Sequence, residues 1–251
     1  MSTEVGTTVG TFVWHENVST DPDKAKDFYT QLFGWEIEVF KPGEMDYPMI
    51  KSGEAMHGGF QRPQGDVPPH WLGHVHVEDV DETVRRAEAA GGKIEFGPMD
   101  IPEVGRMAVI RDPQGAVISA FQPAGDAPVS QGVFVWDELY TSDVDGAKNF
   151  YRELFGWDSA GMDMGEGRTY TLFRVGEKDV GGCMAIHEGE EAPPQWYPYL
   201  ATPDVDASTA KAKELGATVY VEPMEVENVG RFSVLGDPTG ATFGLFQVPS
   251  S

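Results

Sequence analysis

Carboxylates stand within apolar stripes at two matching places in the sequence. In the strand predicted over residues 12–18, Glu16 shares a face with Trp14, because side chains alternate between the two faces of a strand. Glu138 and Trp136 repeat this arrangement in the second half of the chain. A buried carboxylate must be paired, hydrogen-bonded or protonated. We therefore expect Glu16 and Glu138 either to act as catalytic bases or metal ligands, or to accept structural hydrogen bonds.

Two histidines, His74 and His76, stand at alternate positions of one predicted strand. Their side chains share a face about 6.6 Å apart along the strand, within reach of one metal ion. With Glu16 they would form a set of two histidines and one carboxylate, which binds Fe(II) or Zn(II). The alternative is a pair of hydrogen-bonded or partly exposed histidines. The second half has Tyr199 and Ala201 at these positions, so we expect at most one histidine-rich centre.

Aromatic side chains near these positions could line a site for a flat or hydrophobic ligand. The candidates are Trp14, Trp136, Tyr140, Tyr197, Tyr199, Phe121 and Phe246. The alternative is that they belong to the core, because aromatic residues dominate protein cores. Cys183 is the single cysteine, which excludes an intramolecular disulfide and a cysteine-based metal cluster.

The elements that must position these residues occur twice. Residues 14–35 match residues 136–157 at 12 of 22 positions, and residues 98–122 match residues 223–247 at 12 of 25. A repeat of this length has the size of a domain and is too long for a solenoid unit. The sequence therefore indicates a duplicated domain.

Each half predicts two units in which a strand and a helix precede three strands. In the first unit, Asp21 and Pro22 begin a helix and Gly34 ends it. Four such βαβββ units give an α+β fold, in which paired units would form two half-barrel clefts. We place the domains at residues 1–124 and 129–251, joined by a linker rich in proline, glycine and alanine.

The composition excludes several classes of partner. The chain of 251 residues has 18 basic and 41 acidic side chains, a net charge of −23. Nucleic acids and anionic membranes would be repelled, so we expect a small-molecule partner instead. No stretch approaches the ~20 apolar residues of a membrane span, and the first residues do not resemble a signal peptide. We therefore expect a cytoplasmic protein.

The segments AKDFYTQLFGW and AKNFYRELFGW, with DPQG and DPTG before the last strand of each half, carry a family resemblance. The chain resembles the vicinal oxygen chelate superfamily, which includes glyoxalase I, bleomycin- and fosfomycin-resistance proteins and extradiol dioxygenases. The resemblance implies βαβββ units paired into open half-barrels, with the ligand in the concave cleft. It also implies a divalent metal in the enzymatic members, whereas other members bind ligands without metal. Units pair either within or between repeats in this superfamily, and the sequence leaves both arrangements open.

The metal positions of the superfamily fall here on side chains that are poor ligands. They correspond to Trp14, Leu72 and Ser119 in the first half, and to Trp136, Tyr197 and Gly244 in the second. Tryptophan, leucine and glycine side chains offer no ligand atom for such a cation. A single divalent metal, Zn, Fe, Ni or Mn, would therefore require a shifted site at His74 and His76 with Glu16 or, if the units pair the other way, with Glu138.

Two functions follow from the resemblance. The first is a metal-dependent lyase, isomerase or oxygenase acting on an oxygenated metabolite, in which a glutamate moves a proton. The second is a metal-free binding protein that sequesters a cationic aromatic molecule, as bleomycin-resistance proteins do. A third possibility is an interaction scaffold with vestigial clefts. Because duplication supplies the pairing within one chain, a monomer would suffice, and a homodimer stays open.

Overall fold

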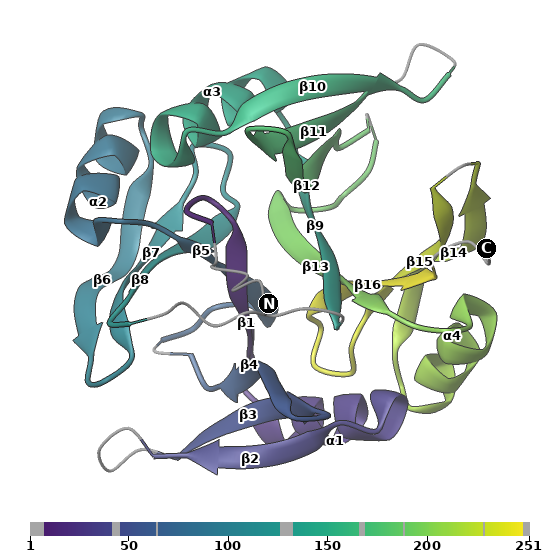
Figure 1. The fold of residues 1–251 in the computed structure, drawn as a ribbon. Coiled ribbons are helices and arrows are strands. Elements are labelled where there is room, and N and C mark those ends of the chain that lie inside the picture. Colours follow the sequence, from purple (N-terminus) through teal and green to yellow (C-terminus); the bar gives the residue numbers. More distant parts are fainter. Residues whose placement is uncertain are drawn as a thin grey trace, which may run out of the picture. The chain divides into compact units, whose positions relative to one another are not determined.

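The structure, a computed structural model, describes residues 8–41, 46–63, 65–125, 133–165, 169–187, 189–227 and 229–247. Each half of the chain contains two βαβββ units, as predicted (Figure 1). The first half consists of β1 (Phe12–Val18), α1 (Pro22–Phe33), β2 (Glu36–Phe40), β3 (Tyr47–Ser52) and β4 (Ala55–Gln61), then β5 (His70–His76), α2 (Val80–Ala89), β6 (Lys93–Ile101), β7 (Gly105–Arg111) and β8 (Val117–Pro123). The second half consists of β9 (Phe134–Thr141), α3 (Val144–Phe155), β10 (Asp158–Asp163), β11 (Thr169–Val175) and β12 (Lys178–Ala185), then β13 (Gln195–Ala201), α4 (Val205–Glu214), β14 (Thr218–Val226), β15 (Gly230–Gly236) and β16 (Thr242–Gln247).

Hydrogen bonding joins the strands of each half into one mixed sheet. The strand order is β2-β3-β4-β1-β5-β8-β7-β6 in the first sheet and β10-β11-β12-β9-β13-β16-β15-β14 in the second. The predicted α+β fold is therefore confirmed. The strands of paired units hydrogen-bond within a repeat, which answers the question that the sequence left open.

Local sequence signals determine where the helices begin and end. The Asp21 carboxylate accepts a hydrogen bond from the Lys24 backbone N–H at 3.2 Å, and Pro22 occupies the first turn of α1. Gly34 ends α1 at a φ of 72°, in the left-handed region that favours glycine. The helix α3 begins at Asp143 and ends at Gly156 in the same way.

Compact packing divides the chain differently from hydrogen bonding. Unit 1 contains Met1–Trp14, Gly73–Val129 and Asp137–Trp196, and unit 2 contains His15–Leu72, Ser130–Trp136 and Tyr197–Ser251. Each of these compact units therefore combines one βαβββ motif from the first half of the chain with one from the second half. Each sheet takes its strands from one half of the chain, whereas each compact unit combines segments of both halves, and the domain bounds 1–124 and 129–251 stay a prediction. Beyond residue 125, the predicted linker lies outside the described residues.

Each unit has its own aromatic core beneath its helices. In unit 1, Tyr151 contacts Trp157, Phe173 and Trp196. In unit 2, the corresponding Tyr29 contacts Trp35, Phe60, Trp71 and Phe243. The tyrosine of each repeated FY pair therefore lies in an aromatic core, and both halves of the chain contribute residues to these cores.

A buried polar chain crosses each core. In unit 2, the Trp71 indole N–H donates to the Tyr29 hydroxyl at 2.8 Å, and this hydroxyl donates to Asp237 Oδ2 at 3.1 Å. Asp237 Oδ1 also accepts backbone N–H groups of its own DPTG turn. Burial, and the negative charge of Asp237, hold the pKa of Tyr29 well above its usual range, so the hydroxyl remains a donor.

Unit 1 repeats this polar chain with its own residues. Trp196 donates to the Tyr151 hydroxyl at 2.7 Å, and Tyr151 donates to Asp112 Oδ2 at 2.9 Å. Burial raises the pKa of Asp112, while the hydrogen bonds from Tyr151 and the DPQG turn act in the opposite direction. These chains give the recurring Trp, Tyr and Asp residues a structural role.

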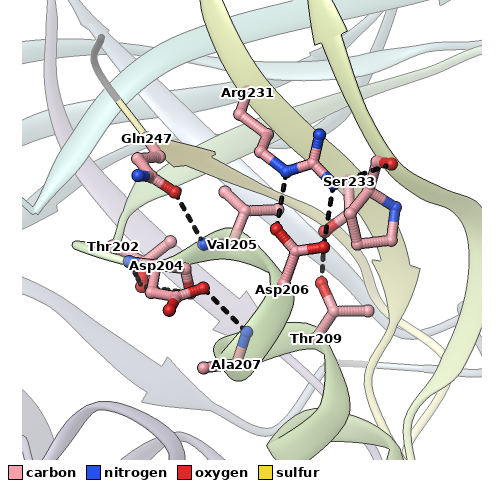
Figure 2. A network of polar contacts seen from close by, with 10 residues as sticks. Thr202, Asp204, Val205, Asp206, Ala207, Thr209, Arg231, Ser233 and Gln247 are labelled. Atoms are coloured by element: carbon pink, nitrogen blue, oxygen red, sulfur yellow. Dashed lines mark hydrogen bonds and ion pairs between the residues drawn. The ribbon is translucent and has the colours of Figure 1, made fainter. Parts of the chain in front are cut away.

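A polar network fixes the start of α4 in unit 2 (Figure 2). The Arg231 guanidinium on β15 donates to both carboxylate oxygens of Asp206, at 2.6 and 2.8 Å. Thr209 and Ser233 share a buried hydrogen bond of 2.8 Å, and Asp204 caps the helix. The network joins the first turns of α4 to strand β15.

Candidate functional site

The strand β5 presents its histidines on the face opposite the helical core. Val75 and Val77 lie in the core of unit 1, so the alternating positions place His74 and His76 on the other face. His74 is 3% exposed and His76 is half-buried. The His74 ring stands edge-on to Phe121, with 6.2 Å between ring centroids. The predicted sharing of a face is therefore confirmed, and the predicted metal role stays a prediction.

In unit 2, Glu16 is part of a carboxylate–tyrosine pair. Its side chain is 8% exposed, and Oε1 accepts a hydrogen bond of 2.7 Å from the Tyr47 hydroxyl. Glu16 lies opposite Gly59 in the pairing of β1 with β4. A Cβ at position 59 would overlap the Tyr47 hydroxyl, so glycine leaves the room through which Tyr47 reaches the carboxylate.

Unit 1 contains a second pair of the same construction. Glu138 is 5% exposed, and its Oε2 accepts a hydrogen bond of 2.7 Å from the Tyr170 hydroxyl. Glu138 lies opposite Gly182 on β12, where a Cβ would overlap the Tyr170 hydroxyl. Each half therefore holds a buried carboxylate in a fixed orientation, able to accept a proton or attract a cation.

Neither tyrosine is among the site residues predicted from the sequence, although the spacing between each tyrosine and the Gly-Gly pair that follows it could have indicated both. Tyr47 stands 12 residues before Gly59, and Tyr170 stands 12 residues before Gly182. This spacing is equal in both halves even though the intervening residues differ. Aligning the halves through the Gly-Gly pairs would therefore have identified both tyrosines.

Unit 2 also carries an aromatic face around β13, β15 and β16. Tyr199 lies opposite Gly244, and a Cβ at position 244 would lie 2.7 Å from Tyr199 Cγ, so the ring passes across the glycine. The Tyr199 ring is 5.6 Å from the Tyr197 ring and 6.0 Å from the Phe232 ring. Phe246 pairs with Phe232 on the neighbouring strand. This aromatic face contains the predicted residues Tyr197, Tyr199 and Phe246, and Phe232 is an addition to them.

The remaining aromatic candidates lie in different surroundings. Trp14 and Trp136 are half-buried, and Phe121 packs with Val13 and Met107 in a small apolar cluster of unit 1. The Tyr140 hydroxyl donates to the Glu190 carboxylate. Burial and this hydrogen bond raise the pKa of Tyr140 to about 12, so it stays protonated at neutral pH.

The donor sets of the described residues do not fit a divalent metal. In this part of the chain, no three histidine, cysteine, aspartate or glutamate side chains are grouped to hold an ion, and the expected set of His74, His76 and Glu16 stays a prediction. Within unit 2, the carboxylate of Glu16 is engaged by Tyr47, and within unit 1 the His74 ring packs against Phe121. Cys183 adds no ligand, because burial raises the pKa of its thiol to about 12.

Comparison with known proteins identifies the family. A family model described as the Glyoxalase/Bleomycin resistance protein/Dioxygenase superfamily matches residues 15–119 and again residues 133–245. This chain belongs to that superfamily. The predicted resemblance is thereby confirmed, and the two matched segments correspond to the two repeats.

Curated relatives of this superfamily match nearly the whole chain. A protein named putative glyoxylase CFP32, from Mycobacterium tuberculosis, is 36% identical over 248 residues, covering 95% of both chains. The anthracycline biosynthesis protein DnrV of Streptomyces peucetius is 30% identical over 259 residues, covering 95% of this chain and 94% of that protein.

The fold also matches a solved structure of the superfamily. The Mn(II)-bound glyoxalase from Novosphingobium aromaticivorans superposes with a TM-score of 0.63 at 17% identity, covering 95% of this chain and 82% of that one. At this identity the likeness shows the fold alone. As to location, none of the described helices has the length and apolar character of a membrane span.

Proposed function

We propose that this protein binds a small planar aromatic cation without a metal ion. The observation that carries the proposal is the aromatic face of unit 2, formed by Tyr197, Tyr199, Phe232 and Phe246. Ligand sites in proteins are commonly lined by aromatic side chains with a few polar groups. The superfamily supplies the precedent, because its name includes bleomycin-resistance proteins.

Part of this face is accessible to a ligand, although Tyr197 and Tyr199 are only 7% and 6% exposed. Phe232 and Phe246 are half-buried, and the neighbouring Met224 on β14 is 46% exposed. Aromatic rings and a methionine thioether interact favourably with the face or edge of a planar ring system. The face therefore offers an apolar surface on which such a ring system could stack.

The charge distribution supports a cationic ligand. Glu16 and Glu138 each keep a carboxylate on a sheet, oriented by a tyrosine hydroxyl at 2.7 Å. The chain as a whole carries a net charge of −23, which would raise the local concentration of cations and repel anions. Each unit thus holds one of these buried acidic groups, and the negative charge of the chain favours a cationic ligand.

The name of one relative is consistent with this ligand class. DnrV, which is 30% identical over nearly its whole length, is named for anthracycline biosynthesis. Anthracyclines combine a planar ring system with an amino sugar that is positively charged near neutral pH. We therefore choose daunorubicin, a fluorescent anthracycline, as the first probe for this protein.

A fluorescence titration with daunorubicin tests the proposal. Wild-type protein should quench the probe saturably, and EDTA should leave the Kd unchanged. Phe232→Ala should weaken binding about two- to tenfold, because an aromatic contact contributes about 0.5–1.5 kcal/mol. Met107→Ala, at the matching position of β7, is the control and should bind like the wild type. Binding that is not saturable, or that requires added metal, would contradict the proposal.

A metal-dependent lyase, isomerase or oxygenase is the other function that the superfamily suggests. It would need a ligand set that the described residues do not assemble, so we derive no catalytic step from it. Elemental analysis separates the two functions. A stoichiometric divalent metal in protein purified without chelator, lost in His74→Ala, would favour the enzyme.

A further inference from the structure

We infer that the two repeats are not equivalent, and that only the second leaves part of an aromatic face, at Phe232 and Phe246, accessible to the ligand, so that each chain binds one molecule. The inference rests on the proposed function and adds the residues that decide the stoichiometry. These are Tyr199 and Gly244 in unit 2, against His74 and Ser119 in unit 1. The two pairs occupy the same register between the equivalent strands.

Gly244 is what allows a large ring to lie flat at position 199. A Cβ at position 244 would approach Tyr199 Cγ to 2.7 Å, closer than real side chains pack. At the matching position of the first repeat, Ser119 already carries a Cβ and a hydroxyl, and it is fully buried. A ring at position 74 therefore cannot lie across its neighbour, and the smaller His74 ring stands edge-on to Phe121 instead.

The first repeat also covers its apolar face with its own side chains. Val13 is fully buried and packs with Met107 and Phe121, which are 8% and 6% exposed. These three residues close the surface on which a planar ligand would have to lie. All three side chains belong to unit 1 and pack against one another there.

The second repeat leaves the corresponding residues uncovered. Val135, the counterpart of Val13, is 38% exposed. Phe232 and Phe246, the counterparts of Met107 and Phe121, are half-buried. Val229, in the turn before β15, is 41% exposed. Apolar residues that are exposed in the second repeat and buried in the first are what a surface that binds a partner or ligand requires. Phe232 in place of Met107 also adds a rigid ring to this face.

Calorimetric titration of the full chain with daunorubicin measures the stoichiometry directly. We expect one molecule per chain. The double variant Tyr199→His with Gly244→Ser gives the second repeat the residues of the first, and it should bind at least tenfold more weakly. The matched variant His74→Ala in the first repeat should keep the wild-type Kd and stoichiometry.

A reciprocal variant tests the same idea by gain of binding. His74→Tyr with Ser119→Gly gives the first repeat the tyrosine and glycine of the second, and Val13→Ala removes one of the three residues that close its surface, so a second molecule per chain should then bind. Circular dichroism and the melting temperature of each variant report whether it folds. The stoichiometry measured on the wild-type protein tests the inference even if a variant fails to fold.

The possible results separate the inference from the proposed function. Two molecules per wild-type chain, or loss of binding in His74→Ala with retention in the Tyr199→His and Gly244→Ser variant, would overturn the inference and leave the proposed function standing. No saturable binding by the wild type would overturn both.

Discussion

At the scale of single residues, the two carboxylate–tyrosine pairs are the most specific feature of the molecule. The sequence pattern correctly placed Glu16 and Glu138 among buried residues, each at 8% exposure or less. The equal spacing before the Gly-Gly pairs marks Tyr47 and Tyr170, but only sheet pairing shows that they reach carboxylates about 30 residues away. The glycines opposite each glutamate are a consequence of this contact.

Removing a tyrosine hydroxyl should destabilise the protein measurably. Tyr170→Phe leaves the buried Glu138 carboxylate without one donor, so the free energy of unfolding should fall by about 1.5–3 kcal/mol. Tyr47→Phe should behave alike, since both hydrogen bonds measure 2.7 Å. Urea unfolding measures the change. The control is Tyr220→Phe, whose side chain is 56% exposed and which should change stability by less than about 0.5 kcal/mol.

If both buried variants unfold at the wild-type urea concentration, the tyrosines do not support the glutamates. The pairs would then have no part in fixing the orientation of the carboxylates.

At the scale of elements, an aspartate caps the start of each helix, and ion pairs join α2 to β7 and α4 to β15. On α4, the hydrogen bonds from Arg231 hold the pKa of Asp206 below its usual range. Arg106 does the same for Asp81 on α2. Sequence reasoning predicted the caps, because capping is local. The arginine contacts span 25 residues and depend on how each helix lies on its strands.

The lowered pKa of Asp206 predicts a pH-dependent loss of stability. A carboxyl whose pKa is lower in the folded state stabilises the protein above its unfolded pKa, about 3.9, and this stabilisation disappears as the pH falls through the folded pKa. Asp206→Asn should therefore melt below the wild type at pH 6, and the difference should shrink as the pH falls below the unfolded pKa, about 3.9, and through the lower folded pKa. Asp145→Asn, at the same position of α3, controls for the helix dipole. A melting difference that persists at low pH would show that the Arg231 contact is not electrostatic.

At the scale of the whole chain, the two repeats are interlocked through their cores. Each compact unit combines one βαβββ unit from either half, and the buried Tyr–Asp hydrogen bonds span 208 residues in unit 2 and 39 in unit 1. The repeat boundary in the sequence is therefore a boundary between sheets and not between packed cores.

The charge of the whole chain predicts a strong response to salt. Self-repulsion among 41 acidic and 18 basic side chains, a net charge of −23, opposes compaction and is screened by added ions. Raising NaCl from about 0.1 M to 1 M should shift the urea midpoint upward, since the Debye length falls from about 10 Å to 3 Å. Sucrose of equal osmolality is the uncharged control. A midpoint that stays constant or falls in salt would contradict this account.

The sequence by itself determined what is local or repeated: the duplicated βαβββ units, the helix caps at Asp21 and Asp143, and the faces on which His74, Glu16 and Glu138 lie. These follow from backbone periodicity and capping chemistry within a few residues. Only the tertiary structure decided which half contributes to which core, and that Tyr47 and Tyr170 hold the glutamates. The same is true of the flat ring of Tyr199 across Gly244. Such contacts join residues distant in the chain, and strand pairing, which local propensity does not specify, brings them together.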